Sequence, residues 1–156
     1  MNNAADPVPI VYFDSSAFVK LLVEEDDSDI AAALWDGCDA AVSSRLAYPE
    51  VRAALAAAGR ARRMGADEQR LALAMWEEYW AATRAVELTR DVAHRAGHLA
   101  TAHALGGADA VHLASVLAIG VDGTVFAVWD QRLRTAAQEA AVEVVPRRPR
   151  QPTDAP

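Results

Sequence analysis

Four acidic residues stand where the sequence pattern ends a strand or begins a helix: Asp14, Glu50, Asp109 and Asp130. Asp14 closes an apolar run that begins at Val8, and Asp130 follows the apolar residues 125–129. In a parallel α/β sheet the carboxyl ends of the strands share one crevice, so acids from distant segments can converge there. A cluster of carboxylates at that edge would bind a divalent cation.

Each acid also has a structural explanation. Asp14 could cap a helix, and Asp109 could lie in a first helical turn and favour the macrodipole, each stabilising by roughly 0.5 to 2 kcal/mol. Asp130 could open the last helix in the same way. Glu50 is harder to explain as structure, because apolar neighbours such as Val51 suggest that its surroundings face the core. All four acids nevertheless fall where one cluster at the strand ends would need them, which favours shared chemistry.

Short apolar runs alternate with longer helical patterns, which predicts an α/β sandwich. Strands are expected near residues 9–13, 40–43, 85–88, 124–129 and 142–145. Helices are expected near residues 16–23, 28–36, 45–63, 67–82, 90–104, 108–119 and 131–139. Each candidate acid therefore lies beside a predicted boundary between elements.

The 156 residues fit one domain, and a hydrophobic share of 53% is ample for its core. No apolar stretch approaches the ~20 residues of a membrane span, and residues 1–6 do not resemble a leader peptide, so we expect a cytoplasmic protein without membrane contact. The single cysteine, Cys38, excludes an internal disulfide and a cysteine-based zinc site. Residues 9–145 are predicted to form the domain, between an extension at 1–8 and a disordered tail at 146–156 rich in proline and arginine.

The net charge of −7 argues against binding of nucleic acid through a basic surface. Positive charge is concentrated at residues 60–63 and 147–150, and an acidic pocket could still hold RNA through metal ions. Lys20 and Arg52 are candidate phosphate contacts because each lies close to a proposed acid in the sequence.

Four segments follow one another in a recognisable order: YFDSSAFVKL (12–21), SSRLAYPEVRAAL (43–55), ADAVHLAS (108–115) and WDQRL (129–133). They resemble the PIN-domain ribonucleases and, more narrowly, the VapC toxins of bacterial toxin–antitoxin pairs. The resemblance extends from about Ile10 to Val145. It implies a single PIN-like domain, in which a central parallel sheet of about five strands is sandwiched by helices. It also places the family's acids at Asp14, Glu50, Asp109 and Asp130, with a supporting hydroxyl at Ser16.

This resemblance implies a metal-dependent endoribonuclease that hydrolyses RNA phosphodiester bonds with metal-activated water. Mg²⁺, with Mn²⁺ as a substitute, prefers carboxylate and water oxygens. Asp14 and Asp109 are expected to be the principal ligands, while Glu50 and Asp130 bind a second ion or orient the attacking water. The resemblance further implies a homodimer and a cognate antitoxin that covers the groove near the active site.

Two positions complicate this interpretation. Val128 stands where the family often has a Thr or Ser that supports the metal site. Pro49 would disrupt the interior of a helix, so the helix is expected to start near Tyr48 or to kink there, which would aim Glu50 inward.

His112, three residues after Asp109, could approach the site, although such a residue is more often packed within its helix.

Two other functions stay open. One is a non-catalytic PIN-like module that binds RNA or an antitoxin, and the other is a metal-dependent phosphohydrolase acting on small phosphate esters. A stripe containing Trp76, Tyr79 and Trp80 fits either core packing or a groove for a partner.

Overall fold

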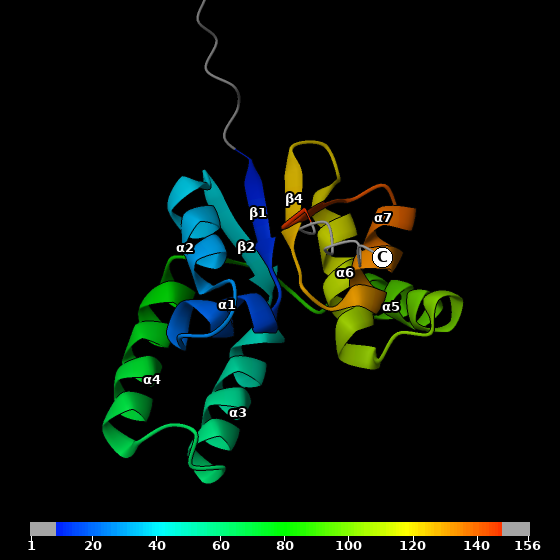
Figure 1. Ribbon diagram of the computed structural model, residues 1–156. Helices are drawn as coiled ribbons and strands as arrows, with labels where there is room; N and C mark the ends of the chain where they lie inside the picture. The colour runs from blue at the N-terminus through cyan, green and yellow to red at the C-terminus, as the bar shows by residue number, and fades with distance from the viewer. Residues whose placement is uncertain (1–8, 148–156) are drawn as a thin grey trace, which may run out of the picture.

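The computed structural model describes residues 9–147, in which five strands form one sheet and helices cover both faces (Figure 1). The strands are β1 (Ile10–Phe13), β2 (Ala40–Ser44), β3 (Arg84–Val86), β4 (Thr124–Ala127) and β5 (Glu143–Val145). The helices are α1 (Ser15–Leu22), α2 (Ser28–Gly37), α3 (Ala47–Arg60), α4 (Ala66–Ala81), α5 (Arg90–His103), α6 (Gly107–Ile119) and α7 (Gln131–Glu139). Every predicted strand and helix in this range is confirmed, with bounds that shift by a few residues. The predicted extension at 1–8 and most of the predicted tail, 148–156, lie outside the described residues.

The sheet is parallel throughout and has the order β3-β2-β1-β4-β5. The chain leaves β1 on one side to build β2 and β3, and it returns on the other side to build β4 and β5. The order therefore reverses between β1 and β4, where Phe13 pairs with Ala127. In open α/β sheets, ligands bind beyond the carboxyl ends of the strands at such a reversal.

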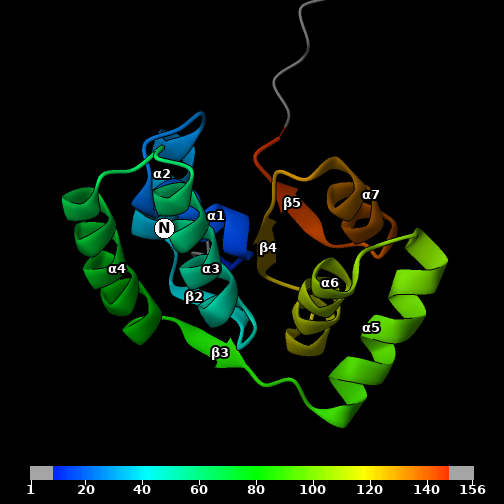
Figure 2. The same cartoon turned by 90° about the horizontal axis from the view of Figure 1, so that it is seen from below.

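Each face of the sheet packs against its own group of helices. Figure 2 shows α1 to α4 on one side of the strands and α5 to α7 on the other. The alternation of side chains along β1 supplies both cores, because Tyr12 joins the cluster with α5, α6 and α7, while Val11 and Phe13 join the cluster with α1, α3 and α4. No single helix in the described range has the length and apolar character of a membrane span, and only α5 and α6 together, across a bend of 117°, reach that composition.

Local sequence explains how α3 and α4 begin and pack. Pro49 lies in the first turn of α3, where the missing N–H has no intrahelical partner to lose, so the predicted helix start near Tyr48 is confirmed. Trp76 of α4 is fully buried, and its ring centroid is 4.9 Å from that of Phe18. Core packing therefore explains Trp76, which leaves Trp80 half-buried beside it.

Candidate active site

Asp14 and Asp130 lie at the ends of the two strands that flank the reversal, and both cap helices. Asp14 follows β1 and caps α1, where its Oδ1 accepts a 2.8 Å hydrogen bond from the backbone N–H of Ala17. Asp130 follows β4 and caps α7 through a 2.9 Å bond from Leu133. The capping explanation is therefore correct for both residues. It is compatible with a second role, because capping through Oδ1 leaves the other carboxylate oxygen available.

Glu50 and Asp109 join this cluster from the first turns of α3 and α6. Asp14 is only 4% exposed, and its burial is the main reason that its pKa rises to about 6. The Asp109 and Glu50 carboxylates raise the Asp14 pKa further, whereas His112 opposes the rise. Burial likewise raises the pKa of Asp109, and repulsion from Asp130 and Glu50 adds to it. The four predicted acids thus interact as one electrostatic cluster.

A buried hydrogen-bond relay fixes Glu50. Its Oε1 lies 2.7 Å from Nε2 of His112, and Nδ1 of His112 lies 2.8 Å from the Tyr12 hydroxyl. That hydroxyl also accepts a 3.0 Å bond from the backbone N–H of Ser44. With the Tyr12 hydroxyl donating to Nδ1, Nε2 carries the hydrogen that Glu50 accepts, and every polar group in the relay has a partner. His112 is 1% exposed and Tyr12 is fully buried, so this part of the relay belongs to the buried interior.

His112 lies beside Glu50, and its role in the site stays a prediction, whereas the sequence reasoning missed Tyr12. Tyr12 reads as an ordinary core residue of β1, and burial raises its pKa well above the usual range. The only sequence signal was its place two residues before Asp14, on the opposite face of the strand.

The two predicted phosphate contacts already have acidic partners. Nζ of Lys20 lies 3.1 Å from Glu25, and the ammonium group is 5.1 Å from the ring centroid of Trp129. Arg52 lies 2.8 Å from Glu77 on the exposed surface between α3 and α4. Both residues lie on the side of the sheet that packs against α1 to α4, and their contact with phosphate stays a prediction.

Ser16, the expected supporting hydroxyl, and Val128, which stands where the family often has a hydroxyl, differ in their exposure. Ser16 is exposed in the first turn of α1, beside the capping bond of Asp14. Val128 is fully buried and packs in the apolar cluster with α7 and β5, so its side chain is part of the core beneath the acids.

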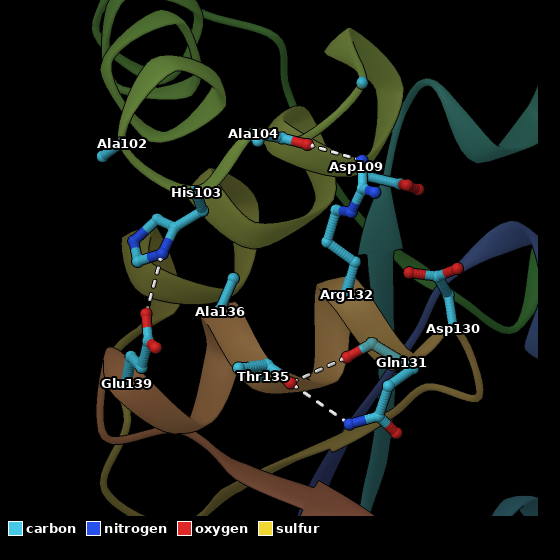
Figure 3. Close-up of a pocket in the computed structure, with 11 residues that line it drawn as sticks. Ala102, His103, Ala104, Asp109, Asp130, Gln131, Arg132, Thr135, Ala136 and Glu139 are labelled. Atoms are coloured by element: carbon cyan, nitrogen blue, oxygen red, sulfur yellow. Dashed lines mark hydrogen bonds and ion pairs between the residues drawn. The ribbon is translucent and has the colours of Figure 1, made fainter.

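A pocket of about 850 Å³ opens beside Asp109 and Asp130, between the end of α5, the start of α6 and the length of α7 (Figure 3). Arg132 reaches along its wall and donates a 3.0 Å hydrogen bond from Nη1 to the carbonyl of Ala104. At the other end, Nδ1 of His103 lies 3.0 Å from Glu139. Sequence reasoning assigned no function to Arg132, although it follows Asp130 by two residues.

Comparison with known proteins identifies the family. A model of the PIN domain matches residues 11–148. This chain belongs to the PIN-domain family. It is 64% identical over 139 residues to Ribonuclease VapC45 and to Ribonuclease VapC49 of Mycobacterium tuberculosis, matches that cover 89% of this chain and 96% of each relative. The VapC-type family predicted from the four segments is therefore confirmed.

Solved structures agree on the fold of this PIN domain. Mycobacterium tuberculosis VapC20, described as a sarcin-ricin loop cleaving toxin, superimposes with a TM-score of 0.63 at 19% identity, covering 81% of this chain and 94% of that one. A toxin–antitoxin complex from Klebsiella pneumoniae gives a TM-score of 0.53 at 18% identity, covering 77% and 86%. The predicted α/β class and parallel sheet are confirmed.

The donor set of this PIN domain fits a hard divalent cation. All four acids offer carboxylate oxygens, and burial together with neighbouring carboxylates raises the pKa of Asp14 and of Asp109. Residues 9–147 contain no group of three His, Cys, Asp or Glu side chains already arranged around one metal position. Mg²⁺ does not need such a cage, because it usually keeps several waters and binds through one or two carboxylates together with substrate phosphates.

Proposed function

We propose that this VapC-type protein is the toxin of a toxin–antitoxin pair and cleaves RNA as a metal-dependent endoribonuclease. The observation that supports this most strongly is the convergence of Asp14, Glu50, Asp109 and Asp130 at the strand reversal. The 64% identity to proteins named as ribonucleases supports RNA as the substrate.

The four acids would have different roles because their surroundings differ. Asp14 and Asp109 would hold Mg²⁺ or Mn²⁺, with Asp130 and Glu50 ligating a second ion or orienting water around the first. A bound ion would lower the pKa of a water molecule and stabilise charge on the phosphodiester. Glu50 keeps one orientation because His112 holds it, so its free oxygen can receive a proton or direct a water at a fixed position. Hydrolysis by water would leave a 5′-phosphate and a 3′-hydroxyl.

The proposed partners follow the same relatives. A cognate antitoxin is supported by structural similarity to the Klebsiella pneumoniae toxin–antitoxin complex. We also propose that the protein forms a homodimer and acts in the cytoplasm, where RNA is available.

Incubation of the purified protein with total RNA tests this function. We expect cleavage in Mg²⁺, loss of cleavage in EDTA, and products with 5′-phosphate ends. Asp109→Asn should be inactive, while His98→Asn, a change at an exposed position on α5, should cleave like the wild type. Binding without cleavage would favour the non-catalytic module, and hydrolysis of small phosphate esters alone would favour a phosphohydrolase. Cyclic 2′,3′-phosphate ends would contradict attack by water.

A further inference from the structure

The pocket beside Asp109 and Asp130 is continuous with the proposed catalytic edge, because both acids form part of its wall. A molecule that fills the pocket therefore lies directly against the reacting centre. Its volume of about 850 Å³ is within the usual range of small-ligand sites, which is roughly 300 to 1,000 Å³. That space can take one nucleotide of an extended chain.

The charges in the pocket explain how an anion could enter so acidic a region. Arg132 lies on the wall that Asp109 and Asp130 share. Lys20, Arg52 and Arg70 each have a carboxylate partner, whereas within residues 9–147 Arg132 donates to the neutral carbonyl of Ala104. The Arg132 charge is therefore available to a ligand in a way that the other three are not.

Arg132 is also oriented before any ligand arrives. Its Nη1 is held by the carbonyl of Ala104, the residue that ends α5 in the left-handed conformation with a φ of 53°. A guanidinium group fixed through one nitrogen can present its remaining N–H groups to a phosphate, and fewer rotamers are lost on binding.

The remaining lining favours a nucleotide over an apolar protein segment. Gln131 and Thr135 bring polar side chains, and Nε2 of Gln131 donates a 3.2 Å hydrogen bond to Oγ1 of Thr135. His103 and Glu139 add an ion pair at the far end, and Ala102 and Ala136 leave space between these groups. Among the described residues, the pocket lining contains no large apolar side chain that could hold a protein partner's hydrophobic residues.

We propose that this pocket binds the nucleotide adjacent to the scissile phosphate of single-stranded RNA, with Arg132 as a ligand of the RNA backbone. An unpaired nucleotide is required, because a base held in a duplex cannot turn into such a pocket. The proposal rests on the proposed ribonuclease function and adds to it a site for the neighbouring nucleotide, with Arg132 as the backbone ligand.

The test measures binding of a fluorescently labelled single-stranded RNA of mixed sequence in Mg²⁺, with Asp14→Asn in every protein to prevent cleavage. Adding Arg132→Gln should weaken binding roughly tenfold. It should also reduce the slope of log affinity against log salt by about 0.7, which corresponds to one phosphate contact on a single strand. A purely structural role through the Ala104 carbonyl would leave the slope unchanged, because the slope reports phosphate contacts.

Two further variants separate the pocket from general charge and from folding. Arg70→Gln removes the same charge from exposed α4 and should leave the slope unaltered. Ala102→Trp, at an exposed position on the pocket wall, should block RNA binding. In a chain that keeps Asp14, the same substitution should leave the thermal stabilisation by Mn²⁺ intact. Equal affinity and slope in Arg132→Gln, or unimpaired binding in Ala102→Trp, would overturn the pocket assignment.

The outcomes distinguish this proposal from the proposed function. If the wild-type protein cleaves RNA but Arg132→Gln binds normally, the ribonuclease function stands and the pocket assignment fails. If the protein binds RNA with the expected slope change but never cleaves it, the pocket assignment stands and the catalytic function fails.

Discussion

The acid cluster has two halves with opposite surroundings. The inner half, Asp14 and Glu50, lies against the buried relay of His112 and Tyr12. The outer half, Asp109 and Asp130, borders an open pocket, and Asp130 is exposed. Asp14 is therefore shielded from solvent and the partly exposed Glu50 is held by His112, while the outer half is open to solvent and to ligands. Under the proposed function, the inner half would fix the position of a cation and the outer half would admit the substrate.

The largest expected effect comes from neutralising one acid in each half, which tests whether both halves belong to one site. Asp14→Asn and Asp109→Asn should each lower the cleavage rate by at least about 100-fold, because both halves contribute to one site. The double variant should be little worse than either single variant, since residues that act as a unit are not additive. If the rate loss of the double variant equals the product of the two single losses in a quantitative RNA cleavage assay, the halves act separately.

The support that the relay gives to Glu50 can be tested by removing the Tyr12 hydroxyl. Tyr12→Phe removes the hydroxyl that bonds His112 and Ser44, so cleavage activity and apparent Mn²⁺ affinity should fall by roughly 10- to 100-fold, as is typical when a partner of a metal ligand is lost. Tyr48→Phe, at a half-buried tyrosine that bonds Glu77, is the matched control. Unchanged Mn²⁺ affinity in Tyr12→Phe would show that the relay does not support the site.

Burial of Asp14 also predicts that the stability of the metal-free protein depends on pH. The pKa of Asp14 is raised from 3.8 to about 6, chiefly by burial, so ionisation of Asp14 costs stability as pH rises through that range. Asp14→Asn should therefore be more stable than the wild type in EDTA above about pH 7, by up to roughly 3 kcal/mol, and this gain should shrink towards pH 4. Asn remains a good helix cap, so the capping bond to Ala17 is retained.

Urea unfolding at several pH values measures this difference. Asp67→Asn, an exposed acid in the first turn of α4, should show no such pH dependence. A gain that does not change with pH would contradict the assignment of an ionisable, buried Asp14.

The smallest expected effect concerns the core beneath both halves. Val128→Thr would bring the residue that the family often has, but in this chain the side chain lies in the apolar cluster. We expect a loss of about 1 to 2 kcal/mol in the free energy of unfolding and no gain in cleavage activity, because the new hydroxyl would lie in the apolar cluster. Higher activity in Val128→Thr would show that this position reaches the metal site.

Much of this architecture is visible in the sequence because local signals agree. The alternation of apolar runs and helical patterns predicts each strand and helix, and the acids mark the ends of β1 and β4. Pro49 even predicts where α3 begins. These features depend on short-range chemistry, which a sequence pattern records directly.

The missed features depend on contacts between distant segments. The Tyr12–His112 bond joins residues 100 positions apart, and the Arg132–Ala104 bond joins residues 28 apart. Neither residue differs in type from an ordinary core tyrosine or a solvated arginine. The inward orientation of Val128 likewise depends on how β4 and α7 pack, which a single sequence pattern does not specify.

Binding of Mn²⁺ to the purified protein, followed by titration calorimetry, tests most directly whether the four acids form one cation site. We expect saturable binding by the wild type, and loss of that binding in both Asp14→Asn and Asp130→Asn, one variant from each half. Asp67→Asn should bind like the wild type. Equal Mn²⁺ binding in all four proteins, or heats reproduced by NaCl of matched ionic strength, would mean that the acids at the strand ends share no cation site.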